Sequence, residues 1–408
     1  MDSKRPRKES LTMSEGGGGN DGGRISTGYP LPLKIVSDIL SRLPIKSVVR
    51  FEAVSKPFAA LIKSPDFVSA HLRRHSPTGS SFLIRRLADP TVCGFHFSLI
   101  DGRTAAVGDI PIPFMDSLSR FPKIVGSCCG LVCLDVSMLH ASAFLLWNIA
   151  TRKVGSVPRS RIFVERPPFW MVAVGFGSNC DNSDIKLVRI VYFKRRMEEL
   201  PLVRAEVFSW GLGRWSLIDA DATQAALQSC SITEGQKAVA ANGALHWVGV
   251  EIEKPSMNKY IVSLDLGTEE FSRVPTPDYG SELPTCVQVM GFKGMLGLAA
   301  YPAQSFKPSP YKFIDLWTLD DGIRWTKITS LRPGIIGIGI PVGILNDSEL
   351  IMKREEGHYV HISSFDGNAR VKWNIPVFSV PEFACEVYGF VDSVYPVAPF
   401  EEVDAAEG

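Results

Sequence analysis

Pairs of neighbouring acids are the residues in this sequence with the clearest capacity for covalent chemistry. Two carboxylates facing each other across a bound sugar can hydrolyse a glycosidic bond, and adjacent acids occur at Glu198-Glu199, Glu269-Glu270, Asp320-Asp321 and Glu355-Glu356. Adjacent side chains on a strand point to opposite faces, so each pair by itself predicts solvated residues. Carboxylates from distant parts of the chain could still converge, and this alternative stays open.

Cysteines and histidines are the candidate metal ligands. The sequence has eight cysteines and no CxxC pair, and Cys128, Cys129 and Cys133 have no histidine near them, which favours a role in an apolar core. His358 and His361 lie in a strand-like pattern, where they point to opposite faces. The nucleophile-elbow, phosphate-loop and dinucleotide motifs are absent from the sequence. We therefore expect no catalytic residue, no metal and no cofactor, and a protein that is not an enzyme.

One segment, residues 159–170, combines arginines with large aromatic side chains. These residue types are enriched at the energetic centres of protein interfaces. We predict that Arg161, Phe163, Phe169 and Trp170 contact a protein substrate. An ordinary connecting loop is the alternative.

Composition excludes several functional classes. The 408 residues include 44 Lys and Arg against 43 Asp and Glu, a balance that argues against a surface built for nucleic acid. The sequence holds no uncharged apolar stretch of about 18 residues and no signal peptide. We expect no membrane partner, reduced thiols, and a cytoplasmic or nuclear location.

The first predicted helices begin after a glycine-rich stretch near the start of the sequence. Residues 1–28 lack apolar periodicity and predict a disordered tail; within it, Lys4–Lys8 resembles a short nuclear import signal, with a solubilising arm as the alternative. Residues 29–75 carry apolar side chains at helical spacing, interrupted at Pro44, Pro57 and Pro65. This pattern predicts three or four short helices.

The helical region has more apolar surface than so small a bundle can cover by itself. The excess should lie at an interface with another chain, and for any single residue the alternative is packing within the bundle or against the rest of this chain. The residues that we assign to this interface are Leu31, Pro32, Ile35, Ile39, Leu40, Leu43, Pro44 and Val48.

Residues 80–400 change to a strand pattern. Short runs of Val, Ile, Phe, Leu and Trp alternate with Gly, Asn, Asp and Pro, and only Ala222–Ser229 suggests a short helix. Similar strands recur roughly every 50 residues, which is typical of propeller blades. A blade cannot cover its own two faces, so blades stack radially. We predict an all-β propeller of about six blades, followed by an acidic tail at 401–408.

Several stretches of sequence resemble one plant family. Leu31–Phe51, followed by Val54-Ser55-Lys56, resembles an F-box, with Ala53 and Phe58 in place of the usual Cys and Trp. The stretches GSCCGLVCL at 126–134, LWNIATRK at 146–153 and NGALHW at 242–247 are similar to elements of the F-box-associated, kelch-like β-propeller region; Ile149 replaces its usual Pro. The resemblance implies an α+β protein of two domains, a small all-α F-box and an all-β propeller.

The resemblance also implies partners and a function. An F-box docks on a Skp-type adaptor, which joins it to a cullin scaffold, and the propeller holds an unidentified protein substrate. The chain would then be the substrate-recognition subunit of an SCF-type ubiquitin ligase, and the eight apolar residues above would bind the adaptor. Two alternatives remain open: a propeller hydrolase of glycosidase type, and an adaptor-bound scaffold that acts without the ligase.

Overall fold

The structure is a computed structural model. It describes residues 31–75, 81–89, 92–102, 104–111, 122–137, 143–160, 169–179, 184–194, 200–232, 237–252, 259–280, 284, 286–292, 294–302, 313–320, 322, 324–331, 339–345, 349–356, 359–365, 370–378 and 385–397.

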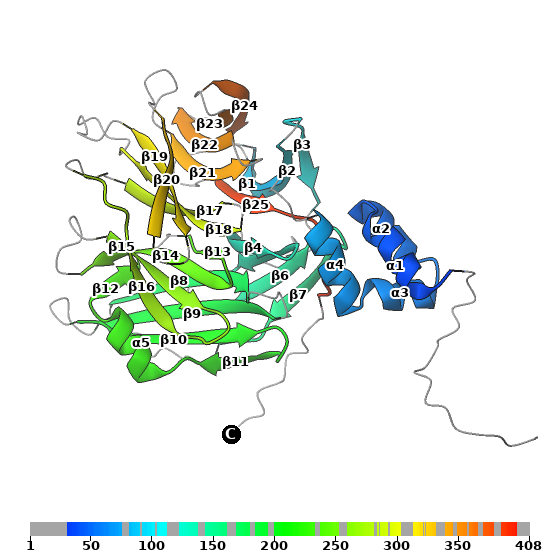
Figure 1. The fold of residues 1–408 in the computed structure, drawn as a ribbon, viewed down its shortest axis with the longest axis horizontal. Helices are drawn as coiled ribbons and strands as arrows, with labels where there is room; N and C mark the ends of the chain where they lie inside the picture. Colours follow the sequence, from blue (N-terminus) through cyan, green and yellow to red (C-terminus); the bar gives the residue numbers. More distant parts are fainter. Residues whose placement is uncertain are drawn as a thin grey trace, which may run out of the picture.

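Four short helices form the amino-terminal part of the described chain (Figure 1): α1 (Leu33–Ser41), α2 (Ile45–Glu52), α3 (Lys56–Ile62) and α4 (Pro65–His75). Pro32 and Pro44 precede α1 and α2, where a missing N–H costs nothing. The hydroxyl of Ser55 accepts from the backbone N–H of Phe58 at 3.4 Å, and that of Ser64 from Phe67 at 3.3 Å. These serines cap α3 and α4, and the predicted run of short helices is confirmed.

The strands form six antiparallel sheets in the described part of the chain. Blade 1 contains β25 (Glu386–Phe390), β1 (Ser81–Asp89), β2 (Val92–Asp101) and β3 (Val107–Ile110), and blade 2 contains β4 (Lys123–Cys128), β5 (Leu131–Asp135), β6 (Phe144–Asn148) and β7 (Lys153–Val157). Blade 3 contains β8 (Phe169–Ser178), β9 (Ile185–Lys194), β10 (Leu202–Ser209) and β11 (Arg214–Leu217). Blade 4 contains β12 (Cys230–Ile232), β13 (Val239–Ala241), β14 (Ala244–Glu251), β15 (Lys259–Asp265) and β16 (Phe271–Pro275). Blade 5 contains β17 (Cys286–Phe292), β18 (Met295–Tyr301), β19 (Ile314–Asp320) and β20 (Arg324–Leu331), and blade 6 contains β21 (Ile340–Leu345), β22 (Glu349–Glu356), β23 (Tyr359–Phe365) and β24 (Val371–Phe378).

The sheets close into a ring. Their innermost strands contact one another in the order β25, β4, β8, β13, β17, β21 and back to β25. Blade 1 is completed by the carboxyl-terminal strand, since Glu386 of β25 pairs with Arg85 of β1. The predicted propeller is confirmed, and it has six blades.

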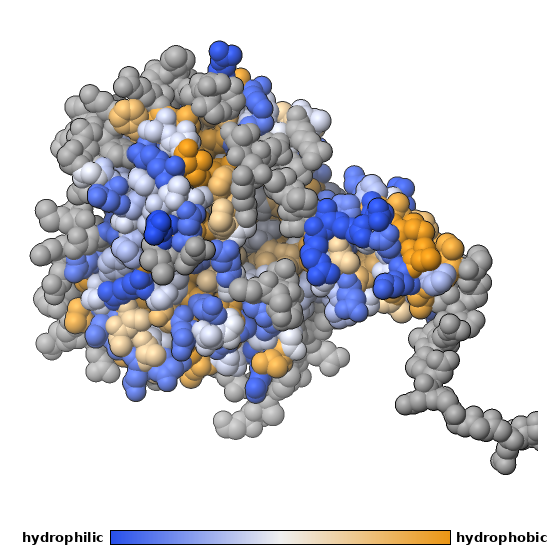
Figure 2. Space-filling model, in the orientation of Figure 1, coloured by the Kyte–Doolittle hydropathy of each residue, from blue (hydrophilic) through white to orange (hydrophobic). Residues whose placement is uncertain are grey.

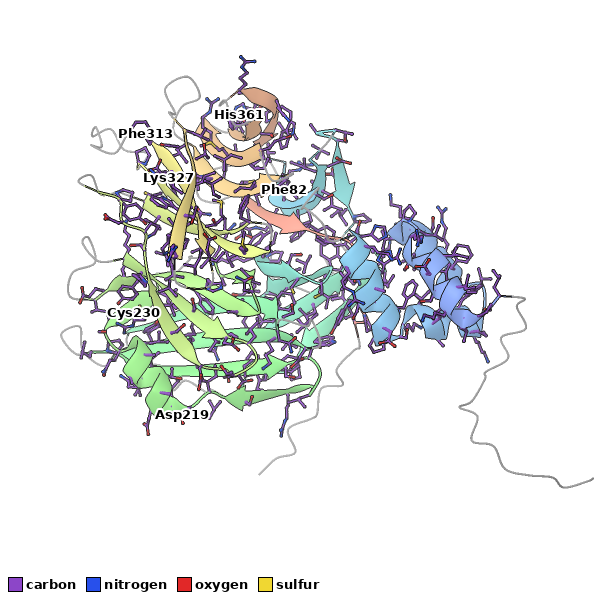
Figure 3. The ribbon with its side chains drawn as sticks, in the orientation of Figure 1. Phe82, Asp219, Cys230, Phe313, Lys327 and His361 are labelled. Carbon is purple, nitrogen blue, oxygen red and sulfur yellow. The ribbon has the colours of Figure 1, made fainter. Side chains whose placement is uncertain are left out.

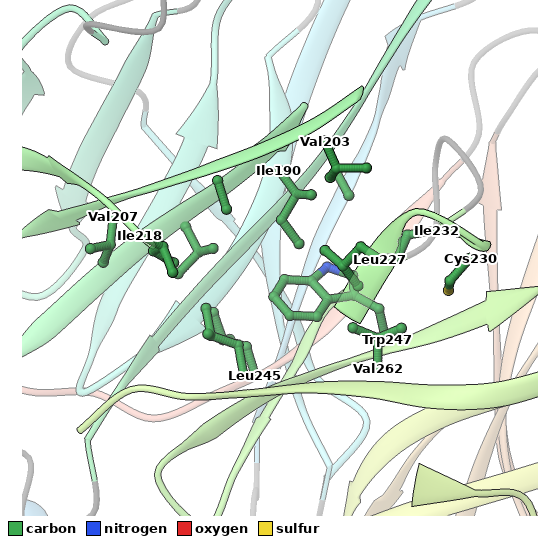
Figure 4. Close-up of a cluster of buried hydrophobic side chains, with 14 of the residues drawn as sticks. Ile190, Val203, Val207, Ile218, Leu227, Cys230, Ile232, Leu245, Trp247 and Val262 are labelled. Carbon is green, nitrogen blue, oxygen red and sulfur yellow. The ribbon is translucent and has the colours of Figure 1, made fainter. Parts of the chain in front are cut away.

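Apolar side chains fill the space between neighbouring blades. Figure 4 shows the cluster between blades 3 and 4, where Trp247 and Leu245 of β14 lie among Ile190 and Val203 of blade 3. At Gly175 of β8 an added Cβ would lie 2.5 Å from the Trp247 indole, so close stacking of these two blades requires glycine there. Burial of both faces of every blade is the main stabilising contribution to the ring.

The short helix expected at Ala222–Ser229 is present as α5 (Ala220–Leu227). It begins two residues earlier than predicted because Asp219 caps it, with a carboxylate oxygen 2.7 Å from the backbone nitrogen of Ala222. Figure 3 labels Asp219 at the edge of blade 3.

Candidate functional site

Helix α1 carries a broad apolar face, only part of which the module core takes up. Val36, Leu40 and Leu43 point into the core of the helical module, together with Val48 and Phe67. A surface helix normally carries polar residues on its other side. In α1 that side carries Lys34, Ser37 and Asp38, and Ile35 and Ile39 lie between it and the side that fills the core.

The outward side of α1 forms the α1 apolar face, which we define as Leu31, Leu33, Ile35 and Ile39. Their side chains are exposed to 45%, 37%, 47% and 47%. Ile35 and Ile39 are four residues apart in α1, so they line one stripe of the helix, and Leu31 and Leu33 are exposed at its start. Figure 2 shows apolar surface at the end of the helical module farthest from the propeller. No described part of this chain covers this face.

The eight residues assigned to the interface from the sequence separate into two groups. Leu31, Pro32, Ile35, Ile39 and Pro44 are exposed, and Leu43 is half-buried.

Leu40 and Val48 are only 3% and 0% exposed and belong to the module core. For these two residues the structure supports the packing alternative, because the turn of α1 that carries Leu40 lies against α4.

Sequence reasoning missed Leu33 and Val54, which is 60% exposed after α2. The signal for Leu33 was present, since it is an apolar first residue of α1, at the exposed start of the helix.

Polar contacts fix the orientation of α1 on α4. The carboxylate of Asp38 forms ion pairs with Arg42, at 2.9 Å, and with Arg74 of α4. The imidazoles of His71 and His75 lie 3.2 and 3.1 Å from the carbonyl oxygens of Leu43 and Ser41. Burial lowers the pKa of His71, so it stays neutral at pH 7. The α1 apolar face is therefore held in one orientation.

Phe58 occupies a half-buried position in the module. Its ring lies edge-on to Phe51 with 5.8 Å between the ring centroids, a favourable aromatic geometry. The smaller aromatic thus has a defined packing partner. Ala53, the other departure from the family pattern, is exposed where α2 ends.

The segment after β25 joins the helical module to the propeller. Val394 is buried in the module core, and Tyr395 and Cys129 pack against the same cluster. The side-chain amide of Asn148 donates to the carbonyl oxygens of Ser393, at 3.0 Å, and Tyr395, at 2.9 Å. One short segment therefore contacts both domains.

An ion-pair network adds to this junction. Glu52 of α2 lies 2.9 Å from the ammonium of Lys63 and 3.8 Å from that of Lys153 in blade 2. The helical module is consequently held at a defined position on the propeller, with apolar surface at its end away from the ring (Figure 2).

Of the predicted substrate contacts, Arg161 and Phe163 lie outside the described residues. Phe169 and Trp170 begin β8, the innermost strand of blade 3, paired with Lys194 and Phe193 of β9. Their assignment as substrate contacts stays a prediction.

Two of the acids that were considered for catalysis have structural partners. Glu269 lies 2.8 Å from the ammonium of Lys186, and Asp320 accepts from the Thr326 hydroxyl at 2.5 Å. Glu198-Glu199 and His358 lie outside the described residues, and His361 contacts Asn374. Among the residues with a described position, no cluster of His, Cys, Asp and Glu could hold a metal ion. The described helices also include none that is long and apolar enough to cross a membrane.

These features define a class of protein: a small helical module with an uncovered apolar face, fixed to a six-bladed propeller. Family comparison agrees with both parts. The model for the F-box domain matches residues 30–69, and the model for the F-box associated beta propeller domain matches residues 91–295. The chain belongs to the plant F-box proteins with an F-box-associated β-propeller domain.

Two relatives from Arabidopsis thaliana show the extent of the similarity. F-box protein CPR1 is 29% identical over 321 residues, which cover 74% of this chain and 73% of that protein. F-box protein At3g07870 is 26% identical over 355 residues, covering 83% of this chain and 79% of that protein. Among solved structures, TolB from Acinetobacter baumannii aligns with 80% of this chain and 72% of its own, at 14% identity and a TM-score of 0.44, which is too distant to bear on function.

Proposed function

We propose that this chain is the substrate-recognition subunit of an SCF-type ubiquitin ligase. The α1 apolar face binds a Skp-type adaptor, the adaptor joins the chain to a cullin scaffold, and the propeller holds a protein substrate. The observation that carries this proposal is the exposed apolar surface of Leu31, Ile35 and Ile39, at and before the start of a helix whose Val36 and Leu40 already fill the module core.

The energetics of this stripe favour a protein partner. Covering an exposed Leu or Ile side chain contributes about 25 cal/mol per Å² of apolar surface removed from water. The stripe is held on a helix whose orientation the Asp38 ion pairs fix, so docking orders little that is mobile. Both features suit a protein interface centred on aliphatic side chains.

The proposed subunit makes and breaks no covalent bond. Its contribution is proximity, because a substrate held beside a ubiquitin-charged enzyme reacts as if within one molecule. The junction through Val394 and Asn148 suits this role, since a fixed module determines where the propeller presents its substrate.

The test replaces Ile35 and Ile39 together, by Ile35→Asp and Ile39→Asp. We expect co-purification with a plant Skp-type adaptor to be lost while the thermal unfolding of the propeller is unchanged. Leu212→Asp is the matched control, because Leu212 is 66% exposed in blade 3 and should not affect adaptor binding. Unchanged adaptor binding by the double variant would contradict the proposal. Leu40 is unsuitable for this test because its replacement would disrupt the module core.

The two alternatives have their own discriminating observations. A glycosidase-type hydrolase requires two facing carboxylates at one mouth of the propeller, and Glu386 at the start of the inner strand β25 pairs instead with Arg85 at 3.0 Å. A scaffold that acts without the ligase would leave the half-life of a bound substrate unchanged when cullin activity is blocked.

The cytoplasmic or nuclear location belongs to the proposal as well. Lys4–Lys8 lies outside the described residues. Nuclear exclusion of a fluorescent fusion after Lys4 and Arg5 are both replaced by Ala would assign import to this run.

A further inference from the structure

The turn between β4 and β5 carries two adjacent cysteines. Cys128 ends β4 and pairs with Leu131, the first residue of β5, so Cys129 and Gly130 are the two central residues of a tight hairpin. Their φ angles are +51° and +77°. Two positive φ angles are typical of a type I′ turn, in which Asn and Gly are the favoured central residues.

Cys129 has a backbone conformation that its residue type does not favour. Glycine adopts the left-handed region without a steric cost, and Asn and Asp do so more readily than other residues. A residue held in such a conformation is kept there by its surroundings, and residues of this kind gather at functional sites. The turn geometry by itself therefore does not explain a cysteine at position 129.

The two thiols lie in contact. The sulfur of Cys128 is 3.5 Å from that of Cys129 and 3.3 Å from the hydroxyl oxygen of Ser178, the last residue of β8. A disulfide bond is about 2.05 Å long, so the two sulfurs would have to approach each other by about 1.5 Å. Both cysteines are half-buried, so a small oxidant reaches the turn, whereas Cys133 of β5 is completely buried.

The two thiols differ in acidity. The hydrogen bond from the Cys128 thiol lowers the pKa of Cys129, and a hydrogen bond with Ser178 lowers it further, against the opposing effect of burial. The same contact between the thiols, together with burial, raises the pKa of Cys128 well above its ordinary value. Because the thiolate is the reactive form of cysteine, Cys129 is the thiol that we expect an oxidant to attack first.

The pair lies where the propeller meets the helical module. Cys129 packs against both the module core and the apolar cluster between blades 2 and 3, and Tyr395 does the same. At Gly130 an added Cβ would lie 2.2 Å from the Cβ of Ser393, so the turn lies directly against the segment that joins the two domains. A movement of the Cys129 sulfur therefore acts on the packing of this segment.

We propose that Cys128 and Cys129 are a redox-sensitive modification site at the domain junction. Hydrogen peroxide converts the two thiols into a disulfide between adjacent residues. This disulfide draws the Cys129 sulfur away from its packing contacts and loosens the segment Ser393–Val397. Neither half of the proposal rests on the proposed function.

The oxidation proceeds in two steps. The Cys129 thiolate attacks one oxygen of hydrogen peroxide, so that a sulfur–oxygen bond forms, the oxygen–oxygen bond breaks, and the leaving hydroxide takes up the proton that Cys129 had released and departs as water. Cys128 then attacks the sulfur of the resulting sulfenic acid, and its proton leaves with the hydroxyl group as a second water. The two thiols lose two electrons in total, and these electrons reduce one peroxide to two waters.

The disulfide should be easy to reduce again. Adjacent Cα atoms are about 3.8 Å apart across a trans peptide, which is closer than the separation of about 4.4–6.8 Å that disulfides usually span. Departures from the usual geometry make a disulfide more reducible. Two molecules of a small thiol therefore restore both cysteines by thiol–disulfide exchange and become a disulfide themselves.

The first test treats the reduced, full-length chain with hydrogen peroxide, alkylates the remaining thiols and analyses the peptides by mass spectrometry. We expect the peptide with Cys128 and Cys129 to lose two hydrogens, to resist alkylation at both residues, and to regain both thiols in dithiothreitol. In Cys128→Ser, Cys129 should stop at the sulfenic acid, which dimedone traps. In Cys129→Asn, which keeps a residue suited to the turn, Cys128 should stay open to alkylation.

A matched control thiol exists on β17. Cys286 is also half-buried, and burial raises its pKa, so it should stay open to alkylation at the same peroxide concentration. The disulfide proposal would be overturned if Cys128 and Cys129 keep both thiols, if Cys129 proceeds to sulfinic acid without a disulfide, or if Cys286 is oxidised equally fast.

The second test measures amide hydrogen exchange of the segment Ser393–Val397, in which the Tyr395 N–H donates to the Ser393 hydroxyl at 2.9 Å. We expect faster exchange in this segment after peroxide treatment of the wild-type chain, and unchanged exchange in β15 of blade 4. Peroxide should leave the exchange of the segment unchanged in Cys129→Asn. A disulfide that forms without faster exchange of Ser393–Val397 would overturn the junction half of the proposal.

Discussion

The side-chain amide of Asn148, in blade 2, lies 2.9 Å from the carbonyl oxygen of Tyr395, in the last described segment of the chain. Asn148 is completely buried, and its amide also donates to the carbonyl of Ser393. Its side-chain oxygen accepts from the backbone N–H of Thr151 at 2.9 Å. One side chain thus satisfies three backbone groups where the two domains meet.

We expect Asn148→Ala to lower the free energy of unfolding by about 1–3 kcal/mol, because it leaves buried polar groups without a partner. Urea unfolding of the purified chain measures this loss. Asn374→Ala is the control, since Asn374 is exposed and its contacts with Ser363 and His361 are at the surface of blade 6. Equal stability of the two variants would contradict the role of Asn148.

Gly130 tests the same junction from the backbone. Its φ is +77°, and an added Cβ would lie 2.2 Å from the Cβ of Ser393. Gly280 has a φ of +76° with no atom within 4 Å of an added Cβ.

Gly280→Ala should therefore lower the free energy of unfolding only by the cost of a left-handed backbone at alanine, about 1–2 kcal/mol. Gly130→Ala should lower it clearly more, because its Cβ would also clash with Ser393. Melting temperatures of the two variants provide the comparison. Similar decreases in melting temperature for the two variants would show that the segment carrying Ser393 can move away from an added Cβ at residue 130 at little cost.

A buried ion pair inside blade 3 predicts a large effect. Arg189 and Glu206 are only 4% and 1% exposed at their side chains, and the guanidinium lies 2.9 Å from the carboxylate. Glu206→Ala leaves a buried guanidinium without its counter-charge and should cost about 3–5 kcal/mol. Arg42→Ala, which breaks the exposed pair with Asp38, should cost less than about 1 kcal/mol. Chemical denaturation of both variants checks this order.

The lowered pKa of Lys237 predicts how stability depends on pH. Its folded value of about 8 lies below the ordinary 10.5, so the unfolded chain binds more protons between these values, and this group's contribution to stability rises with pH in that window. The free-energy cost of burying the charged Lys237 ammonium is fully present below pH 8.

The stability gained by Lys237→Met should accordingly be largest at pH 7 and decline toward pH 10. Two facing groups stay neutral in this window, because burial raises the pKa of Cys385 to about 11 and holds that of Tyr388 well above its ordinary value of 10. Unfolding free energies of both proteins between pH 7 and 9.5 measure this trend, and a difference that does not change with pH would contradict it.

The local architecture could be predicted from the sequence. Helix spacing and prolines predicted three or four short helices within residues 29–75, and strands recurring about every 50 residues predicted the propeller. The strands that set this repeat are the third strands of their blades, such as β6, β15 and β19. Such features follow from residues close together in the chain, whose periodicity shows which side must be buried.

The candidate site could be predicted only in part. Leu31, Ile35 and Ile39 were identified from the sequence as surplus apolar residues, and they are exposed. Leu40 and Val48 carry the same apolar signal but are buried in the module core. Residue type cannot separate these groups. An amphipathic pattern shows that one face of the helix is apolar, but it does not show which part of that face a neighbouring helix covers.

The sequence by itself determined which segments are helices and strands, that the helical module has excess apolar surface, and to which family the chain is similar. Only the tertiary structure decided that β25 completes blade 1, that the segment carrying Val394 fastens the module, and that Lys237 meets Tyr388 across the axis. The physical reason is that these contacts join residues far apart in the chain. Their pairing follows from ring closure of six stacked sheets and leaves no local periodic signal.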